Sequence, residues 1–229
     1  MNIRNERANF EQEIDQKEYE RGSYAAQITL ELGEVASRFS RIERVPRYAD
    51  GERENDSEHS FMLALVAPEL IDALELDLDA SLATQFAIVH DLVELKTGDI
   101  PTLVITEDRK LQKEIDEQIA IRELACTLPP HTMRMLVRYE QQVEPEARFV
   151  RYVDKLLPIV LDVIGSGGRV MREDYNITAP QQLRACQREL HDRIIRTFGN
   201  EFPELDLAHE LLCELFEMRF SEEMEIGLA

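Results

Sequence analysis

The sequence is short of cysteine, of positive charge and of long apolar runs, and each shortage excludes a class of protein. Its three cysteines are widely spaced and form no CxxC pair, which excludes a disulfide framework or a zinc knuckle and indicates reduced thiols in a cytoplasmic protein. Only 26 basic side chains stand against 46 acidic ones, for a net charge of −20, the opposite of the basic footprint of a nucleic-acid-binding protein. No apolar run reaches the roughly 18 residues of a membrane span.

Glycine and proline are also scarce, at nine residues each, and the uninterrupted stretches between them have apolar residues at three- to four-residue spacing. This pattern predicts an all-α protein, with no strand. Residues 1–22 are charged and contain no signal-peptide core, so we expect a loosely docked segment and no secretory leader. The expected helices cover residues 24–42, 57–75, 80–96, 107–128, 131–142, 145–164, 179–198 and 203–218.

The pattern also makes predictions about helix ends and core faces. Ser57 has the character of an N-cap, and Gly98 is placed to end the 80–96 helix. Residues 46–56, PRYADGEREND, are expected to form a loop. The expected core positions are Phe61, Leu65 and Ile71 in the helix after Ser57, and Leu111, Ile115, Ile119 and Leu124 in the 107–128 helix.

Two of the five histidines have unusual neighbours. His59 lies near a helix start, and His90 precedes Asp91 within the apolar stretch FAIVHDLVEL. A buried His–Asp pair is costly unless hydrogen bonds or a cation compensate it, and imidazole with carboxylate suits zinc, manganese, iron, cobalt or magnesium. Glu94 projects from the same side of the helix as His90 and could be the general base for a metal-bound water. An isolated HD dipeptide is more often a polar pair whose hydrogen bonds are satisfied by its neighbours. The choice between such a pair and a metal site therefore depends on the other residues.

The spacing of the whole set favours a metal site. His90 follows His59 by thirty-one residues, and Asp154 follows Asp91 by sixty-three. With the flanking blocks RENDSEHS, HDLVELKTGDIPT and EARFVRYVDKL, the chain resembles the HD-domain metal-dependent phosphohydrolases, in particular their 5′-deoxynucleotidase branch, from about residue 42 to residue 162.

This resemblance implies an HD-domain helical bundle with additional C-terminal helices. We expect residues 1–22 to be a charged N-terminal segment, residues 23–170 to be the HD core and residues 171–229 to pack on that core. The resemblance also suggests a homodimer.

The resemblance further assigns roles to individual residues. Arg44, fifteen residues before His59, would contact the substrate phosphate. The family has a tryptophan after this arginine, linked to selection against the ribose 2′-hydroxyl; here it is Val45, so the preference between deoxyribose and ribose stays open. The resemblance implies one divalent cation bound by His59, His90, Asp91 and Asp154, with Glu94 positioning or deprotonating the attacking water and Asp99 assisting.

An arginine cluster leads into the first of these histidines. Residues 38–53 contain five arginines and three acidic residues, a local charge of +2. A loop beside the metal could turn Arg47 and Arg53, like Arg44, toward an anionic substrate. The overall acidity therefore excludes a long anionic polymer but leaves room for a mononucleotide.

We expect a single-metal site, with His131, His191 and His209 at the surface. The leading hypothesis is removal of the 5′-phosphate from (deoxy)nucleoside monophosphates. One alternative is a nucleotide pyrophospho- or triphosphohydrolase on the same scaffold, although such enzymes, including guanosine-tetraphosphate hydrolases, typically have adjacent acids where Leu95 here follows Glu94. Another is a metal-binding regulatory module without turnover. No nucleic-acid or membrane partner is expected.

Overall fold

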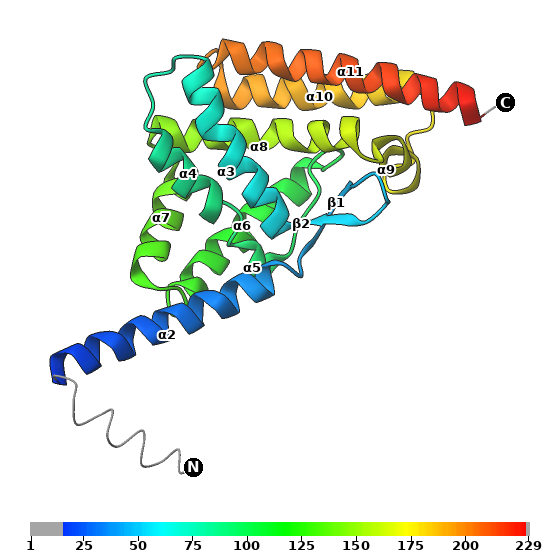
Figure 1. Cartoon of the computed structure of the whole chain (residues 1–229). Coiled ribbons are helices and arrows are strands. Elements are labelled where there is room, and N and C mark those ends of the chain that lie inside the picture. Colours follow the sequence, from blue (N-terminus) through cyan, green and yellow to red (C-terminus); the bar gives the residue numbers. More distant parts are fainter. Residues whose placement is uncertain (1–15, 228–229) are drawn as a thin grey trace.

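The computed structural model describes residues 16–227, and helices dominate it (Figure 1), which confirms the predicted all-α class. Of the predicted N-terminal segment 1–22, residues 1–15 lie outside the described residues. Among residues 16–227, no helix combines the length and apolar character needed to cross a membrane. The helices are α2 (Gln16–Phe39), α3 (Asp56–Ala73), α4 (Ala80–Val89), α5 (Glu94–Thr97), α6 (Glu107–Leu124), α7 (Pro130–Gln141), α8 (Pro145–Ile164), α9 (Gly167–Glu173), α10 (Pro180–Phe198) and α11 (Pro203–Gly227).

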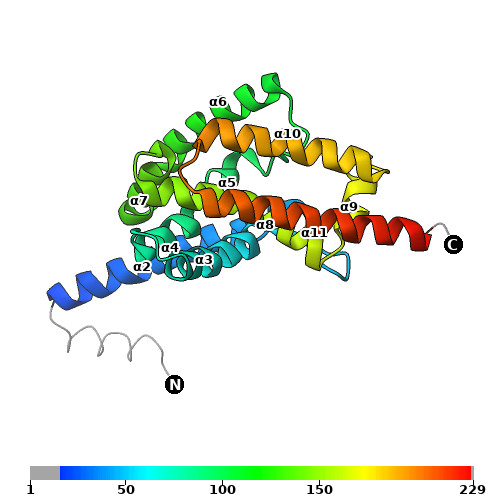
Figure 2. The ribbon, with the colours of Figure 1, turned by 90° about the horizontal axis from the view of Figure 1, so that it is seen from above.

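Helix α8 lies at the centre of the molecule. Helices α3, α4 and α7 pack on one side of it, and α11 packs along the other (Figures 1 and 2). Its fully buried side chains include Phe149, Tyr152, Val153 and Leu157. Burial on both sides explains why this helix is rich in large apolar residues.

A short β-hairpin precedes α3, and the prediction of no strand was wrong at this point. Strand β1 (Glu43–Arg47) pairs antiparallel with β2 (Arg53–Asn55), with an irregular register between its two ends. Strands of five and three residues are too short to show a clear alternation of apolar and polar side chains. The hairpin leads directly into α3.

The N-terminus and core face of α3 also differ from expectation. The N-cap is Asn55 and not Ser57: the Asn55 side-chain oxygen accepts hydrogen bonds from the backbone N–H groups of Ser57 and Glu58 at 3.0 and 3.2 Å. Phe61 and Leu65 are exposed. The buried apolar side chains are Leu63, Ala67 and, as predicted, Ile71, because they lie on the same helical face as the buried polar residues Asp56, His59 and Ser60.

Helix α6 shows why periodicity alone cannot orient a helix. Its predicted core residues Leu111, Ile115 and Ile119 are exposed, and only Leu124 of that set is buried. The opposite, polar face of the helix carries Lys113, which lines an internal cavity described below. A stripe of apolar residues identifies one face of a helix but does not say what that face meets.

The predicted helix over residues 80–96 is divided in two. Helix α4 ends at Val89, residues 90–93 form turns, and α5 begins at Glu94. Gly98 ends α5 as predicted: its φ is +69°, in the region that favours glycine, and its N–H donates to the Glu94 carbonyl at 2.9 Å. The division leaves His90 and Asp91 in a turn.

Candidate metal centre and its cavities

The four predicted metal ligands come together from three helical segments. His59 lies in the first turns of α3, His90 and Asp91 follow α4, and Asp154 lies in the middle of α8. One ligand atom from each lies within 4.8 Å of the others. The His59 Nε2 atom is 2.8 Å from Asp154 Oδ1, and the His90 Nε2 atom is 2.9 Å from Asp91 Oδ2. The packing of α3 and α4 against α8 thus assembles the set.

The local hydrogen bonding of His90 fits a bound cation. Its Nδ1 atom is 2.8 Å from the Ala87 carbonyl oxygen, which requires the proton to be on Nδ1. The Nε2 atom of a neutral ring then presents its lone pair to Asp91, and this buried atom has no hydrogen-bond partner among the described residues. A cation bound between imidazole and carboxylate satisfies both lone pairs. Without one, burial lowers the pKa of His90, but the Asp91 and Asp154 carboxylates overcome this and raise it to about 10.

His59 has a buried carboxylate behind it that the sequence analysis missed. The Glu54 Oε2 atom lies 3.5 Å from His59 Nδ1, and Glu54 is 1% exposed. An acidic partner on Nδ1 directs the Nε2 lone pair of His59 toward the ligand set. The sequence gives no sign of this contact, because Glu54 lies in a stretch that is expected to form a loop and β2 has only three residues.

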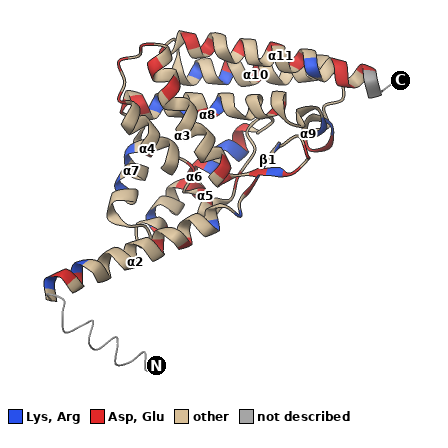
Figure 3. Ribbon diagram, viewed as in Figure 1, with Lys and Arg blue, Asp and Glu red and all other residues tan. Residues whose placement is uncertain are grey.

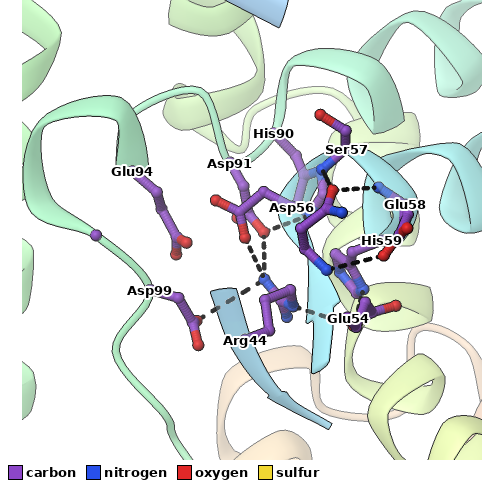
Figure 4. A network of polar contacts seen from close by, with 12 residues as sticks. Arg44, Glu54, Asp56, Ser57, Glu58, His59, His90, Asp91, Glu94 and Asp99 are labelled. Atoms are coloured by element: carbon purple, nitrogen blue, oxygen red, sulfur yellow. Dashed lines mark hydrogen bonds and ion pairs between the residues drawn. The ribbon is translucent and has the colours of Figure 1, made fainter. Parts of the chain in front are cut away.

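Arg44 links these groups in one buried network (Figure 4). The hairpin places its guanidinium against the metal ligands, with Nη1 at 3.0 Å from Asp91 Oδ2. Burial disfavours its charge, yet the surrounding carboxylates, led by Asp91 and Asp99, raise the pKa of Arg44. Its other acidic neighbours are Glu54 at 3.3 Å, Asp56 at 3.4 Å and Asp99 at 3.8 Å.

Glu94 and Asp56 are buried carboxyls beside the ligand set. Glu94 is 3% exposed, and its Oε1 atom is 3.5 Å from Lys113 Nζ. Burial, followed by the charges of Asp91 and Asp99, raises the pKa of Glu94 well above its ordinary value. Burial raises the pKa of Asp56 to about 7. The sequence analysis missed Asp56, which with Asp91 and Glu94 forms a second group of possible ligands.

Two cavities open on the ligand set from different sides. The first, of about 140 Å³, has a polar end at the ligands and an apolar end. The second, of about 280 Å³, lies on the α6 and α7 side and contains several cationic side chains. The first is lined by Arg44, Val45, Asp91, Glu94, Asp99, Lys113, Asp154, Ile159, Asp162, Val170, Met171 and Tyr175, among others. The second includes His90, Asp91, Lys110, Lys113, Arg151, Asp154 and Arg193.

The structure brings some, and not all, of the predicted substrate residues together. Arg44 and Val45 line the first cavity. Arg47 and Arg53 do not; both pair with Asp174, at 3.1 and 2.6 Å, and so tie the hairpin to the end of α9.

The other three histidines differ in their burial. His131 is exposed, as predicted. His191 is partly buried, and the prediction that His209 lies at the surface was wrong: it is 1% exposed and stacks on His191, with ring centroids 5.0 Å apart. Both rings lie where α10 packs against α11, and their expected positions on polar helix faces gave no sign of that contact. Burial, with the charge of His191, lowers the pKa of His209 to about 4.

The chain is similar in sequence and in structure to several known proteins. The HD-domain family model matches residues 36–196. A 5′-deoxynucleotidase of Shewanella oneidensis is 36% identical over 91 residues, which are 38% of this chain and 47% of the relative. A 5′-deoxynucleotidase of Yersinia pestis is 32% identical over 129 residues, 52% and 66% of the two chains. The chain thus spans less than two thirds of the length of these curated relatives.

A solved structure extends the similarity to most of the fold. A predicted metal-dependent phosphohydrolase from Magnetospirillum magnetotacticum superimposes with a TM-score of 0.65 at 25% identity, and the match covers 86% of this chain and 94% of the other. The family match covers more than half of the sequence and includes all four ligand positions. The chain therefore belongs to the HD-domain family.

Proposed function

We propose that this protein is a metal-dependent phosphohydrolase that removes the 5′-phosphate of deoxynucleoside monophosphates. The observation that carries the proposal is the convergence of four buried or half-buried ligands with Arg44 and Glu94 at one end of a cavity. The similarity to two 5′-deoxynucleotidases supports the choice of substrate.

The donor set fits one divalent cation, held by His59, His90, Asp91 and Asp154. When bound, such a cation lowers the pKa of a coordinated water to roughly 7 and neutralises charge on a phosphate oxygen. The structure of the site does not select among manganese, cobalt, zinc, iron and magnesium, because mixed nitrogen and oxygen ligands suit several of them.

The protein's own groups supply the remaining chemistry. Glu94 accepts the proton of the attacking water, a role that suits a buried carboxyl beside the ligand set whose pKa is raised well above its ordinary value. The water oxygen bonds to phosphorus as the bond from phosphorus to the 5′-oxygen breaks, and the departing 5′-oxygen takes up the proton that Glu94 accepted from the water. Arg44 offers its guanidinium fork to the phosphate oxygens in place of part of its contact with Asp91. Asp99, 3.8 Å from Arg44, holds the guanidinium toward the cavity.

A second candidate function is favoured by the second cavity. Its cations Lys110, Arg151 and Arg193, together with Lys113, could receive further phosphates, as in a nucleotide pyrophospho- or triphosphohydrolase. Acidic side chains there, Glu114, Glu117 and Glu140, offset much of this charge, so the monophosphatase remains the preferred proposal.

Product identification separates these functions. Purified protein with manganese or cobalt is offered matched ribo- and deoxyribonucleoside mono-, di- and triphosphates, and the released phosphate species are measured. We expect inorganic phosphate from deoxynucleoside monophosphates. Release of pyrophosphate or triphosphate would favour the second candidate, and stoichiometric metal binding with no product from any nucleotide would favour a regulatory module.

A ligand variant connects turnover to the site. Asp154→Ala removes a ligand on α8 and should abolish both bound metal and phosphate release, whereas Asp192→Ala, at an exposed position of α10, should retain both. Retention of one equivalent of metal by Asp154→Ala would contradict the assignment of the ligand set.

Two further aspects belong to this proposal. A cytoplasmic location is supported by three unpaired cysteines, one of them exposed. A homodimer is supported by apolar side chains exposed along one face of α11, Leu207, Leu211 and Leu215, and light scattering at several protein concentrations tests it.

A further inference from the structure

Helix α8 lines the first cavity along one face. Asp154, Pro158 and Asp162 follow one another at four-residue intervals, and all three border the cavity. Asp154 is at the metal end. Asp162 is eight residues further on, which corresponds to about 12 Å along a helix axis. One helix therefore presents a carboxyl at each end of the same cavity.

Asp162 is buried without a hydrogen-bond partner. It is 8% exposed, and its Oδ1 atom has no partner among the described residues. No described cation lies within ion-pair distance of it, and burial, with the like charge of Glu54, raises its pKa to about 8. An unpaired buried polar group costs stability, so its retention requires an explanation.

The surroundings of Asp162 form an apolar subsite. Ile159, Val170 and Met171 are buried around this end of the cavity, and the partly buried Tyr175 lies beside them. Val45 connects the two ends: it follows Arg44 in the chain, lines the cavity and packs against the same apolar cluster. A flat apolar ligand with a polar edge fits such walls, because the walls contact its faces and the carboxyl meets its edge.

We propose that Asp162 hydrogen-bonds the edge of the nucleobase and makes this chain select nucleotides over sugar phosphates that lack a base. This inference rests on the proposed function, which places the phosphate at Arg44 and the metal ligands. The sugar then lies beside Val45, and the base reaches the subsite of Asp162. A carboxylic acid offers a donor beside an acceptor, and each nucleobase presents such a pair on its Watson–Crick edge.

The test compares substrates with and without a base. For Asp162→Leu we expect the KM for deoxynucleoside monophosphates to rise about 5- to 150-fold, the cost of losing a buried hydrogen bond, with kcat and metal content little changed. Deoxyribose 5-phosphate, which has the sugar and the phosphate but no base, should keep its wild-type KM. Asp162→Asn keeps a donor and an acceptor and should stay near wild type. Asp192→Asn, exposed on α10, is the matched control.

The outcomes distinguish this inference from the proposed function. If Asp162→Leu weakens the use of deoxyribose 5-phosphate as much as that of the nucleotides, or changes only the ratio of deoxyribo- to ribonucleotides, Asp162 does not contact the base and the inference is wrong. Calorimetric binding of the four deoxynucleosides to the manganese-loaded protein gives a readout without turnover. Binding that Asp162→Leu abolishes would support the inference even if no nucleotide were hydrolysed; wild-type protein that binds none of them would overturn it.

Discussion

Replacement of Arg44 by methionine tests how the buried charges of this site are balanced. The change keeps much of the side-chain volume and removes the cation from a group of carboxylates 3.0–3.8 Å away, namely Glu54, Asp56, Asp91 and Asp99. Removing one partner of a buried ion pair costs about 3–5 kcal/mol. For a domain of this size, that corresponds to a fall in Tm of roughly 6–20 °C in the metal-free protein.

Arg44→Met destabilises the metal-free protein, but it should not weaken metal binding. Loss of a positive charge 3.0 Å from the ligand Asp91 makes the donor set more negative, so a divalent cation should bind at least as tightly as before. The bound cation also replaces part of the missing charge, and ligand binding to the folded state alone stabilises it. The loss in Tm should therefore be smaller with manganese than with a chelator, while the KM for the phosphate substrate rises.

Differential scanning calorimetry in EDTA and in manganese, together with metal analysis and steady-state kinetics, measures all three effects. Arg41→Met is the matched control, because Arg41 is three residues away and exposed. An Arg44→Met protein that unfolds in EDTA at the temperature of the control, or that no longer binds metal, would refute this account of the charge balance.

Two other predictions concern single carboxyls. Glu94→Gln should lower kcat by about 10²- to 10⁴-fold without loss of metal; loss of metal in this variant would instead make Glu94 a ligand, through the group it forms with Asp56 and Asp91. Because burial raises the pKa of Asp162 in the folded protein from 3.8 to about 8, the folded state binds more protons than the unfolded state between these values, and stability should fall as pH rises from about 4 to about 8. Denaturant unfolding at pH 5, 7 and 9 should show a flatter dependence for Asp162→Asn than for wild type; equal slopes would contradict the burial argument.

The helices were predictable because their apolar spacing persists over many residues. The bounds predicted for 145–164 and 179–198 agree with α8 and α10 to within one residue. Which face of a helix is buried was less predictable. In α6 the apolar face with Ile115 is exposed, whereas Lys113 on the other face borders a cavity. The burial of each face depends on which distant segments of the chain pack against the helix. The hairpin was missed because three residues of β2 offer too little pattern.

The four proposed ligands could be singled out from the sequence because each stands in a distinctive block, and the structure brings one atom of each within 4.8 Å of the others. The supporting carboxyls could not be singled out. Glu54, Asp56 and Asp162 are three among 46 acidic residues, and nothing in their types separates them from solvated side chains. They are distinguished by burial, at 1%, 0% and 8% exposed, and burial is decided by contacts between segments distant in the sequence.

The arginine cluster illustrates how a local pattern acquires two roles in the fold. In the sequence Arg44, Arg47 and Arg53 form one basic stretch. In the structure Arg47 and Arg53 share Asp174, and the Ser166 hydroxyl donates a hydrogen bond to the Tyr48 carbonyl at 2.8 Å. These contacts fasten the hairpin to the segment after α8, and the fastened hairpin can hold Arg44 among the carboxylates.

The position of Arg44 also reconciles an acidic protein with the proposed anionic substrate. The net charge of −20 is spread over the whole chain, and salt screens exposed charges more than about 8 Å apart at physiological ionic strength. Acidic and basic residues occur together on several of the helices, α2 and α11 among them (Figure 3). Buried charges are screened much less, so the field that a phosphate meets is set by Arg44, by Lys113 and by the cation that the ligand set fits. The buried groups, and not the net charge of the chain, therefore decide whether this site can bind a small anion.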